Sequence, residues 1–103
     1  MDSSSFRDKM LSQITIGYDW ETSNNFAEVK LVTNDGISSS YKIHNLTEYL
    51  LYEDFSANYI SHCKLIVNDS MVYLSLDPYD ELSKEIDLDN DCLWFKGSNI
   101  ESV

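Results

Sequence analysis

The sequence is poor in residues that interrupt or crosslink a chain. Its 103 residues include one proline and three glycines, Gly17, Gly36 and Gly97, which stand far apart. Isolated glycines exclude a glycine-rich phosphate-binding loop, and there is no repeat, linker or low-complexity tract. The two cysteines, Cys63 and Cys92, are too few for a disulfide-dense scaffold.

Long apolar runs are also missing. No stretch approaches the roughly 18 apolar residues that a membrane-spanning helix requires. The N-terminus, Met-Asp-Ser-Ser-Ser-Phe-Arg-Asp-Lys, lacks the apolar region of a secretory signal. We therefore expect a cytoplasmic protein whose two cysteines stay reduced and are buried as small apolar side chains.

Basic residues are scarce. The chain has 7 lysines and arginines against 18 acids, which gives a net charge of −11. Phosphate groups would repel such a chain, so nucleic acid and anionic membranes are excluded as direct partners.

Catalytic patterns are absent as well. His44 and His62 are the only histidines, and no Cys/His spacing fits zinc. His62 and Cys63 are adjacent, so on a strand they point to opposite faces and cannot act as a nucleophile and base pair. The sequence predicts a protein that is not an enzyme and has no cofactor or metal.

What the chain does contain is enough apolar material for one domain over residues 1–103, since 43% of residues are hydrophobic. A short helix is predicted over 3–13, and strands over 14–21, 27–31, 37–43, 59–68, 71–76 and 93–95. Residues 45–55 are predicted as an irregular or short helical connection. The turns Asn34-Asp35-Gly36 and Asn68-Asp69-Ser70 predict two hairpins. The fold class is therefore α+β, mostly β: an antiparallel sheet built from two hairpins with one or two short helices.

Negative charge is concentrated in one segment. Residues 77–91 carry seven acids and one base, Lys84. Glu85, Asp87, Asp89 and Asp91 alternate, so an extended strand would place them on one face, with Ile86 and Leu88 pointing inward. A solvated acidic edge explains such a face, and so does a surface that a cationic partner neutralises. An EF-hand is rejected because Cys92 stands where that loop needs glycine.

Aromatic residues are numerous, with two tryptophans, seven tyrosines and four phenylalanines. We expect Trp20, Tyr41 and Phe95 in the core. Tyr79 follows Pro78 in a loop and is the best candidate for an exposed ring. Tyrosine beside carboxylates is typical of surfaces that bind lysine and arginine.

Three segments carry a family resemblance: Ser-Leu-Asp-Pro-Tyr-Asp-Glu at 75–81, Asp-Asn-Asp at 89–91 and Trp-Phe-Lys-Gly at 94–97. With the short, acidic, β-rich chain, they resemble the small immunity proteins of bacterial polymorphic toxin systems, including contact-dependent growth inhibition. The resemblance implies an antitoxin that binds a cognate basic toxin domain, an RNase or DNase, and occludes its active site. It transfers no catalytic residues.

We expect a monomer that forms a 1:1 complex. Its partner-binding residues are predicted in the acidic segment: Asp77, Tyr79, Asp80, Glu81, Glu85, Asp87, Asp89 and Asp91. Two alternatives remain open. One is a phage-type acidic mimic of nucleic acid that inhibits a restriction or CRISPR effector; the other is a non-inhibitory acidic adaptor subunit.

Overall fold

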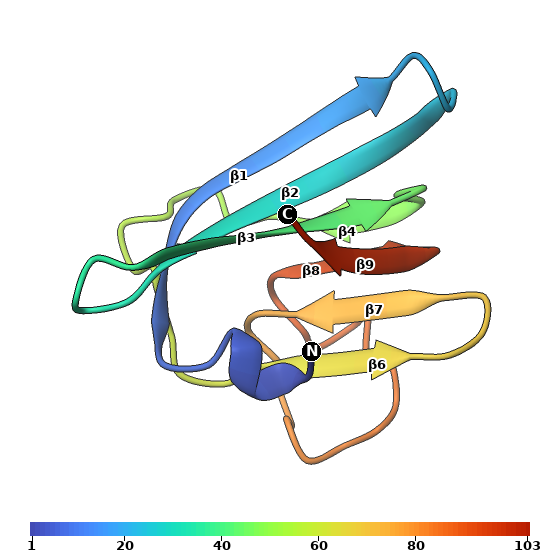
Figure 1. Cartoon of the computed structure of the whole chain (residues 1–103). Helices are drawn as coiled ribbons and strands as arrows, with labels where there is room; N and C mark the ends of the chain where they lie inside the picture. The colour runs from blue at the N-terminus through green and yellow to red at the C-terminus, as the bar shows by residue number, and fades with distance from the viewer.

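Two antiparallel sheets make up the computed structural model, which describes residues 1–103 (Figure 1). The first sheet has five strands in the order β5 (Tyr59–Ile60), β1 (Lys9–Asp19), β2 (Asn24–Val32), β3 (Ser38–His44) and β9 (Asn99–Ser102). The second sheet has four, in the order β4 (Glu48–Leu50), β8 (Trp94–Gly97), β7 (Val72–Ser75) and β6 (Lys64–Val67). The prediction of a mostly β, antiparallel fold is confirmed.

Both predicted hairpins are present, but they belong to different sheets. β2 pairs with β3 in the first sheet, and β6 pairs with β7 in the second. Gly36 takes φ +85° in the first turn, a conformation that glycine adopts without steric cost.

The core lies between the inner faces of the two sheets. Alternation along the strands places Val29, Leu31 and Ile43 on one wall and Leu74 and Phe95 on the other, all completely buried. The predicted core position of Phe95 is thus confirmed.

The sheets meet where Ser98 carries the chain from β8 into β9. The Ser98 amide donates to the carbonyl oxygen of His44 on β3 at 2.9 Å. Gly97 approaches the same carbonyl so closely that a Cβ there would lie 2.6 Å from it. Glycine is therefore required at this joint. The strand predicted over 93–95 is not the last one, because β8 ends at Gly97 and β9 follows.

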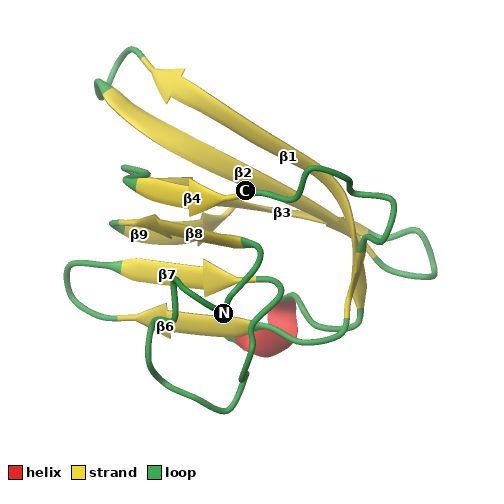
Figure 2. Cartoon of the chain, turned by 180° about the vertical axis from the view of Figure 1, so that it is seen from behind, coloured by secondary structure: helices red, strands yellow, loops and turns green.

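The predicted helix over 3–13 is wrong. Only Ser3–Ser5 form a turn of 3-10 helix, drawn red in Figure 2 and capped by Asp2. From Lys9 onward the chain is β1, because Leu11 pairs with Leu31 of β2 and joins the core. Pairing with a neighbouring strand outweighs a weak local preference for helix.

Three further predictions need correction. Residues 45–55 contain strand β4, which pairs with β8. The single strand over 59–68 is split, with β5 in the first sheet and β6 in the second. Trp20 is 85% exposed at the β1–β2 turn, because β1 and β2 extend past the second sheet and nothing covers their far end (Figure 1). Tyr41 is half-buried and packs on Phe6, with ring centroids 4.7 Å apart.

The chain has no helix with the length and apolarity needed to cross a membrane.

Candidate functional site

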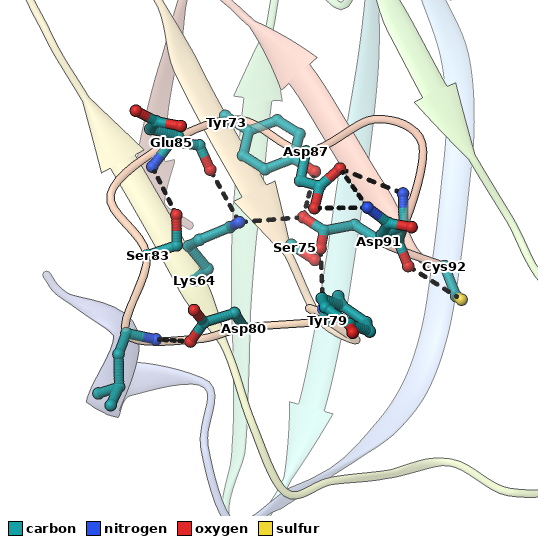
Figure 3. Close-up of polar contacts among 12 residues, drawn as sticks. Lys64, Tyr73, Ser75, Tyr79, Asp80, Ser83, Glu85, Asp87, Asp91 and Cys92 are labelled. Atoms are coloured by element: carbon teal, nitrogen blue, oxygen red, sulfur yellow. Dashed lines mark hydrogen bonds and ion pairs between the residues drawn. The ribbon is translucent and has the colours of Figure 1, made fainter.

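The acidic segment folds back over the outer face of the second sheet. Lys64, Ser75 and Trp94 are cross-strand partners on that face, and Tyr73 lies in the next row. All four are buried, although their side chains point away from the core between the sheets. Residues 77–92, which we call the acidic loop, pass over Lys64, Tyr73 and Ser75 (Figure 3). The segment is a loop of turns without strand structure, so the alternating acids do not share one face of an extended strand.

A buried ion pair fixes the acidic loop to the sheet. Lys64 Nζ lies 3.3 Å from Asp91 Oδ2, with 3% and 0% of the two side chains exposed. The Tyr73 hydroxyl donates to the same Asp91 oxygen at 2.6 Å, and the Tyr79 amide donates to Oδ1 at 2.9 Å. Lys64 also donates to the carbonyl oxygen of Glu85 at 2.8 Å. Burial, followed by the bond to Asp91, raises the pKa of Tyr73. Each end of the pair is therefore satisfied by further hydrogen bonds, as a buried charge requires.

Short turns order the rest of the loop. The Leu82 amide donates to Asp80 Oδ1 at 3.0 Å. Asp87 accepts from the side-chain amide of Asn90 at 3.0 Å, and the Asp87 carbonyl accepts from the Asp91 amide at 3.0 Å. These local hydrogen bonds define the conformation of the loop backbone between Asp77 and Asp91.

Glu81 ties the loop to the N-terminal segment. Its carboxylate lies 3.0 Å from His62 Nδ1 and 3.2 Å from an Arg7 guanidinium nitrogen, and it accepts from the Cys63 amide at 3.3 Å. The hydrogen bond with His62, aided by the Cys63 amide and Arg7, holds the pKa of Glu81 below its usual value of 4.5.

Asp77 begins the loop and is engaged by Tyr52. The Tyr52 hydroxyl donates to Asp77 Oδ2, and the Cys92 amide donates to the Asp77 carbonyl at 3.1 Å. Burial and the bond to Asp77 raise the pKa of Tyr52. The loop is thus closed at its base, where its two ends meet.

The eight predicted partner-binding residues fall into three groups. Tyr79, Asp80, Glu85 and Asp89 are exposed; Asp77, Glu81 and Asp87 are half-buried and hydrogen-bonded within the chain. Asp91 is buried, so it supports the loop from within and presents no carboxylate at the surface. The burial of Asp91 could not be predicted from its position in the run of alternating acids, because only the fold brings Lys64 next to it.

The structure adds one residue that the sequence analysis missed. Leu82 is 87% exposed, and Tyr79 nearby in the loop is 77% exposed. Leu82 lies between Glu81 and Ser83 and fits neither strand nor helix periodicity. The expected exposure of Tyr79 is confirmed. Ile86 is half-buried and Leu88 is 36% exposed, so Leu88 does not point inward as predicted.

A polar hollow lies on the outer face of the first sheet. It has a volume of about 360 Å³ and contains Lys42, His44 and Glu101 among mainly polar residues. His44 Nε2 lies 2.6 Å from Glu101 Oε1. The Ser98 hydroxyl, which lines the same hollow, donates to the His44 carbonyl oxygen at 3.2 Å. No group of three or more His, Cys, Asp or Glu side chains in the chain is arranged to hold a metal ion.

No protein-family model, curated protein or solved structure matches the chain. The resemblance to immunity proteins therefore stays a prediction. Conclusions about function depend on the geometry and charge of the acidic loop.

Proposed function

We propose that the protein is an immunity protein that binds a basic bacterial toxin domain in the cytoplasm. One molecule binds one toxin domain, an RNase or DNase, and covers its active site. The observation that supports this proposal is an acidic loop anchored to the second sheet by the buried Lys64–Asp91 pair, while Tyr79 and Leu82 are exposed to solvent. The protein itself performs no chemistry.

Unneutralised charge on the loop favours a cationic partner. Asp91 is paired with Lys64 and Glu81 with Arg7. The other five acids of residues 77–91 form no ion pair within the chain, and three of them, Asp80, Glu85 and Asp89, are exposed to solvent. Like charges held this close repel one another, so a partner that supplies lysine and arginine relieves the repulsion.

Exposed apolar side chains supply the second half of an interface. Tyrosine is enriched among the residues that dominate binding energies, because its ring offers a large rigid contact area. Tyr79 and Leu82 are 77% and 87% exposed in a loop whose backbone is already ordered. Binding therefore costs little further loop entropy, and the two side chains can fill apolar hollows while the acids pair at the rim.

A nuclease active site fits this surface. It gathers positive charge to hold phosphate groups, and carboxylates on a fixed loop can occupy the same positions. Opposite charges also accelerate the encounter of the two proteins by electrostatic steering. Fast capture suits an inhibitor that must act before the toxin reaches its substrate.

Affinity capture from the producing cell tests the proposal. The tagged wild-type protein is compared with the surface variant Asp80→Asn/Glu85→Gln/Asp89→Asn, which neutralises three exposed carboxylates that form no ion pair. The matched control, Glu21→Gln/Asp35→Asn/Asp69→Asn, removes the same charge from exposed sites outside the acidic loop. Captured proteins are identified by mass spectrometry at low and high salt.

The proposal predicts a basic partner that wild type and control retain and the surface variant loses at low salt. The gene of that partner should adjoin this one, and its C-terminal domain should arrest a bacterial host unless this protein is co-expressed. Recovery of only neutral or acidic partners contradicts the proposal. Capture of a restriction or CRISPR effector would instead indicate the nucleic-acid mimic.

A further inference from the structure

β1 is the longest strand of the molecule, and its outer edge, on the side away from β2, is almost unpaired (Figures 1 and 2). β5 pairs with it only at Lys9 and Met10. The side chain of Asn58 donates to the Leu11 carbonyl oxygen at 3.0 Å. From Ser12 to Asp19 no strand pairs with the outer edge, so it presents a row of backbone donors and acceptors to solvent.

This edge lacks the devices that usually prevent strand addition. Proteins protect exposed edges with charged residues, proline, bulges or very short strands. β1 has a bulge at Ser12, but the following segment, Gln-Ile-Thr-Ile-Gly-Tyr at 13–18, contains no charge and no proline. The other edges are short: β4 has three residues and β5 two, while β6 and β9 have four each.

An apolar groove runs beside the open edge. Ile14 and Ile16 lie opposite Val29 and Ala27 of β2, so they share the inner face of the sheet. With Leu51 and Phe55 on the far wall, they line a hollow of about 250 Å³. This is below the roughly 300–1,000 Å³ of pockets for drug-sized ligands. It suits single apolar side chains from an extended chain better than a small molecule.

The apolar stripe continues beyond the groove to the end of the hairpin. Tyr18 and Trp20 follow Ile14 and Ile16 at the same spacing of two. Tyr18 is 44% exposed and packs edge-on against Trp20, which is 85% exposed, with centroids 5.0 Å apart. An extended chain added to β1 would present every second side chain to this stripe.

We propose that β1 binds an extended segment of a partner protein, with alternating apolar and basic residues, as an added strand. The charge around the groove selects this occupant. No lysine or arginine lines the groove, and two exposed acids, Glu53 and Asp54, stand beside it in the chain segment that joins Leu51 to Phe55. A second copy of this chain fits poorly, because two molecules of net charge −11 would place like charges together.

The inference goes beyond the proposed function, because the edge of β1 and the acidic loop are separate surfaces. In Figures 1 and 2 the β1–β2 hairpin and the acidic loop lie at opposite ends of the molecule. A partner could use one surface without the other. The surface variant Asp80→Asn/Glu85→Gln/Asp89→Asn should therefore bind an added strand as wild type does.

Titration with a synthetic peptide tests the inference. The probe is a capped peptide of about nine residues that alternates valine with lysine, the length of an ordinary strand. Three peptides of the same length serve as controls: one with glutamate in place of lysine, one with the same residues in block order, and one with N-methylated backbone amides. Binding is followed by tryptophan fluorescence and by NMR amide hydrogen exchange.

The probe should bind wild type, shift the fluorescence of Trp20, and slow the exchange of alternate amides between Gln13 and Tyr18. N-methylation should weaken binding about tenfold or more, since it removes several backbone hydrogen bonds. The acidic and block-order peptides should also bind at least about tenfold more weakly.

Protein variants locate the peptide. Tyr18→Lys places a like charge on the exposed part of the stripe and should abolish binding of the basic probe. Ile37→Lys is the matched control, because Ile37 is 63% exposed at the β2–β3 turn, outside the groove. It should bind as wild type does, and circular dichroism confirms that both variants are folded.

The inference is overturned if the probe does not bind, if it binds without protecting β1 amides, or if the acidic peptide binds equally well. It is also overturned if sedimentation shows that wild type dimerises and Tyr18→Lys does not, because the occupant is then a second copy. None of these results depends on a toxin, so the proposed function can fail or succeed separately.

Discussion

Lys64 and Asp91 form the one ion pair that lies wholly inside the protein, with Nζ and Oδ2 3.3 Å apart. Lys64 belongs to β6, whereas Asp91 ends the acidic loop. The pair joins them on the outer face of the second sheet, where an uncovered sheet would otherwise meet solvent. One acid of the acidic loop, Asp91, thus anchors the loop to the sheet. The exposed acids of the loop are held in place by this anchor.

Removing one partner of this pair should be strongly destabilising. We expect Asp91→Asn to lower the free energy of unfolding by about 3–5 kcal/mol, because it leaves the Lys64 charge buried without a counter-charge. Urea unfolding measures the change. Asp89→Asn, at an exposed neighbour, is the control and should change stability by less than about 0.5 kcal/mol. Equal stabilities of the two variants would show that the pair does not anchor the loop.

A double variant separates the ion pair from its surroundings. Lys64→Met/Asp91→Asn removes both charges together and should be more stable than Asp91→Asn alone, because no uncompensated charge remains. Purely additive losses would contradict coupling between the two side chains. Faster amide exchange at Tyr79 in Asp91→Asn would show directly that the loop has been released, since that amide donates to Asp91.

The contacts of Glu81 predict a pH-dependent contribution to stability. Its pKa is lower in the folded protein than the ordinary value of 4.5, mainly through the hydrogen bond with His62. A lowered carboxyl pKa stabilises the fold above the unfolded value, and this contribution is lost as pH falls through the folded value. Urea unfolding of wild type and Glu81→Gln should therefore differ at about pH 7 and converge as the pH falls below 4.5 and through the lower pKa of the folded protein. Glu85→Gln, at an exposed acid without an ion pair, should follow wild type throughout, and a Glu81→Gln curve parallel to wild type at all pH values would refute the assignment.

The two cysteines should differ sharply in reactivity. Burial raises the pKa of the Cys63 thiol to about 12, whereas Cys92 is exposed, so the expected burial is confirmed for Cys63 and wrong for Cys92. Because the thiolate is the reactive form, a thiol reagent should label Cys92 in the native protein and Cys63 only after unfolding. Mass spectrometry counts the labels. Cys92→Ser should then remain unlabelled in its native state, and rapid labelling of this variant would place Cys63 at the surface.

The joint between the sheets should not tolerate a side chain at Gly97. A Cβ there would lie 2.6 Å from the backbone oxygen of His44, which cannot move without shifting β3. We expect Gly97→Ala to cost about 1–3 kcal/mol or more, as overpacking usually does. Ser98→Ala removes only the hydroxyl, which donates to the same carbonyl or to Asn99 Oδ1, and should cost about 0.5–1.5 kcal/mol. Thermal unfolding compares them, and a harmless Gly97→Ala would contradict the close approach.

Local patterns predicted the strands and turns of this protein better than their arrangement. The alternation in 27–31 and 37–43 and the turn at Asp35-Gly36 located the β2–β3 hairpin, because side-chain period and turn chemistry are properties of neighbouring residues. The division into two sheets could not be predicted in this way. The division requires residues 61–63 to interrupt the strand predicted over 59–68. It also requires Gly97 to let the chain cross to the first sheet at Ser98, where the backbone of a distant strand, β3, lies close.

The candidate site shows the same limit. Charge density pointed to residues 77–91, and the exposure of Tyr79 could be predicted from its place beside Pro78. The sequence could not separate Asp91 from Asp89, because both belong to one alternating run. Only the tertiary fold places Lys64 under one of them. The prediction that Trp20 is buried failed for a related reason. An apolar stripe predicts burial, but β1 continues beyond the sheet that would cover it.

The salt dependence of partner binding tests the central claim most directly. The captured basic domain is titrated by calorimetry with wild type, with Asp80→Asn/Glu85→Gln/Asp89→Asn and with the control Glu21→Gln/Asp35→Asn/Asp69→Asn, over a series of salt concentrations. If the acidic loop binds the partner, the first variant has a lower affinity and a flatter salt dependence, while the control follows wild type within about twofold. If all three proteins bind with the same affinity and the same salt slope, the acidic loop is a solvated surface and the partner binds elsewhere.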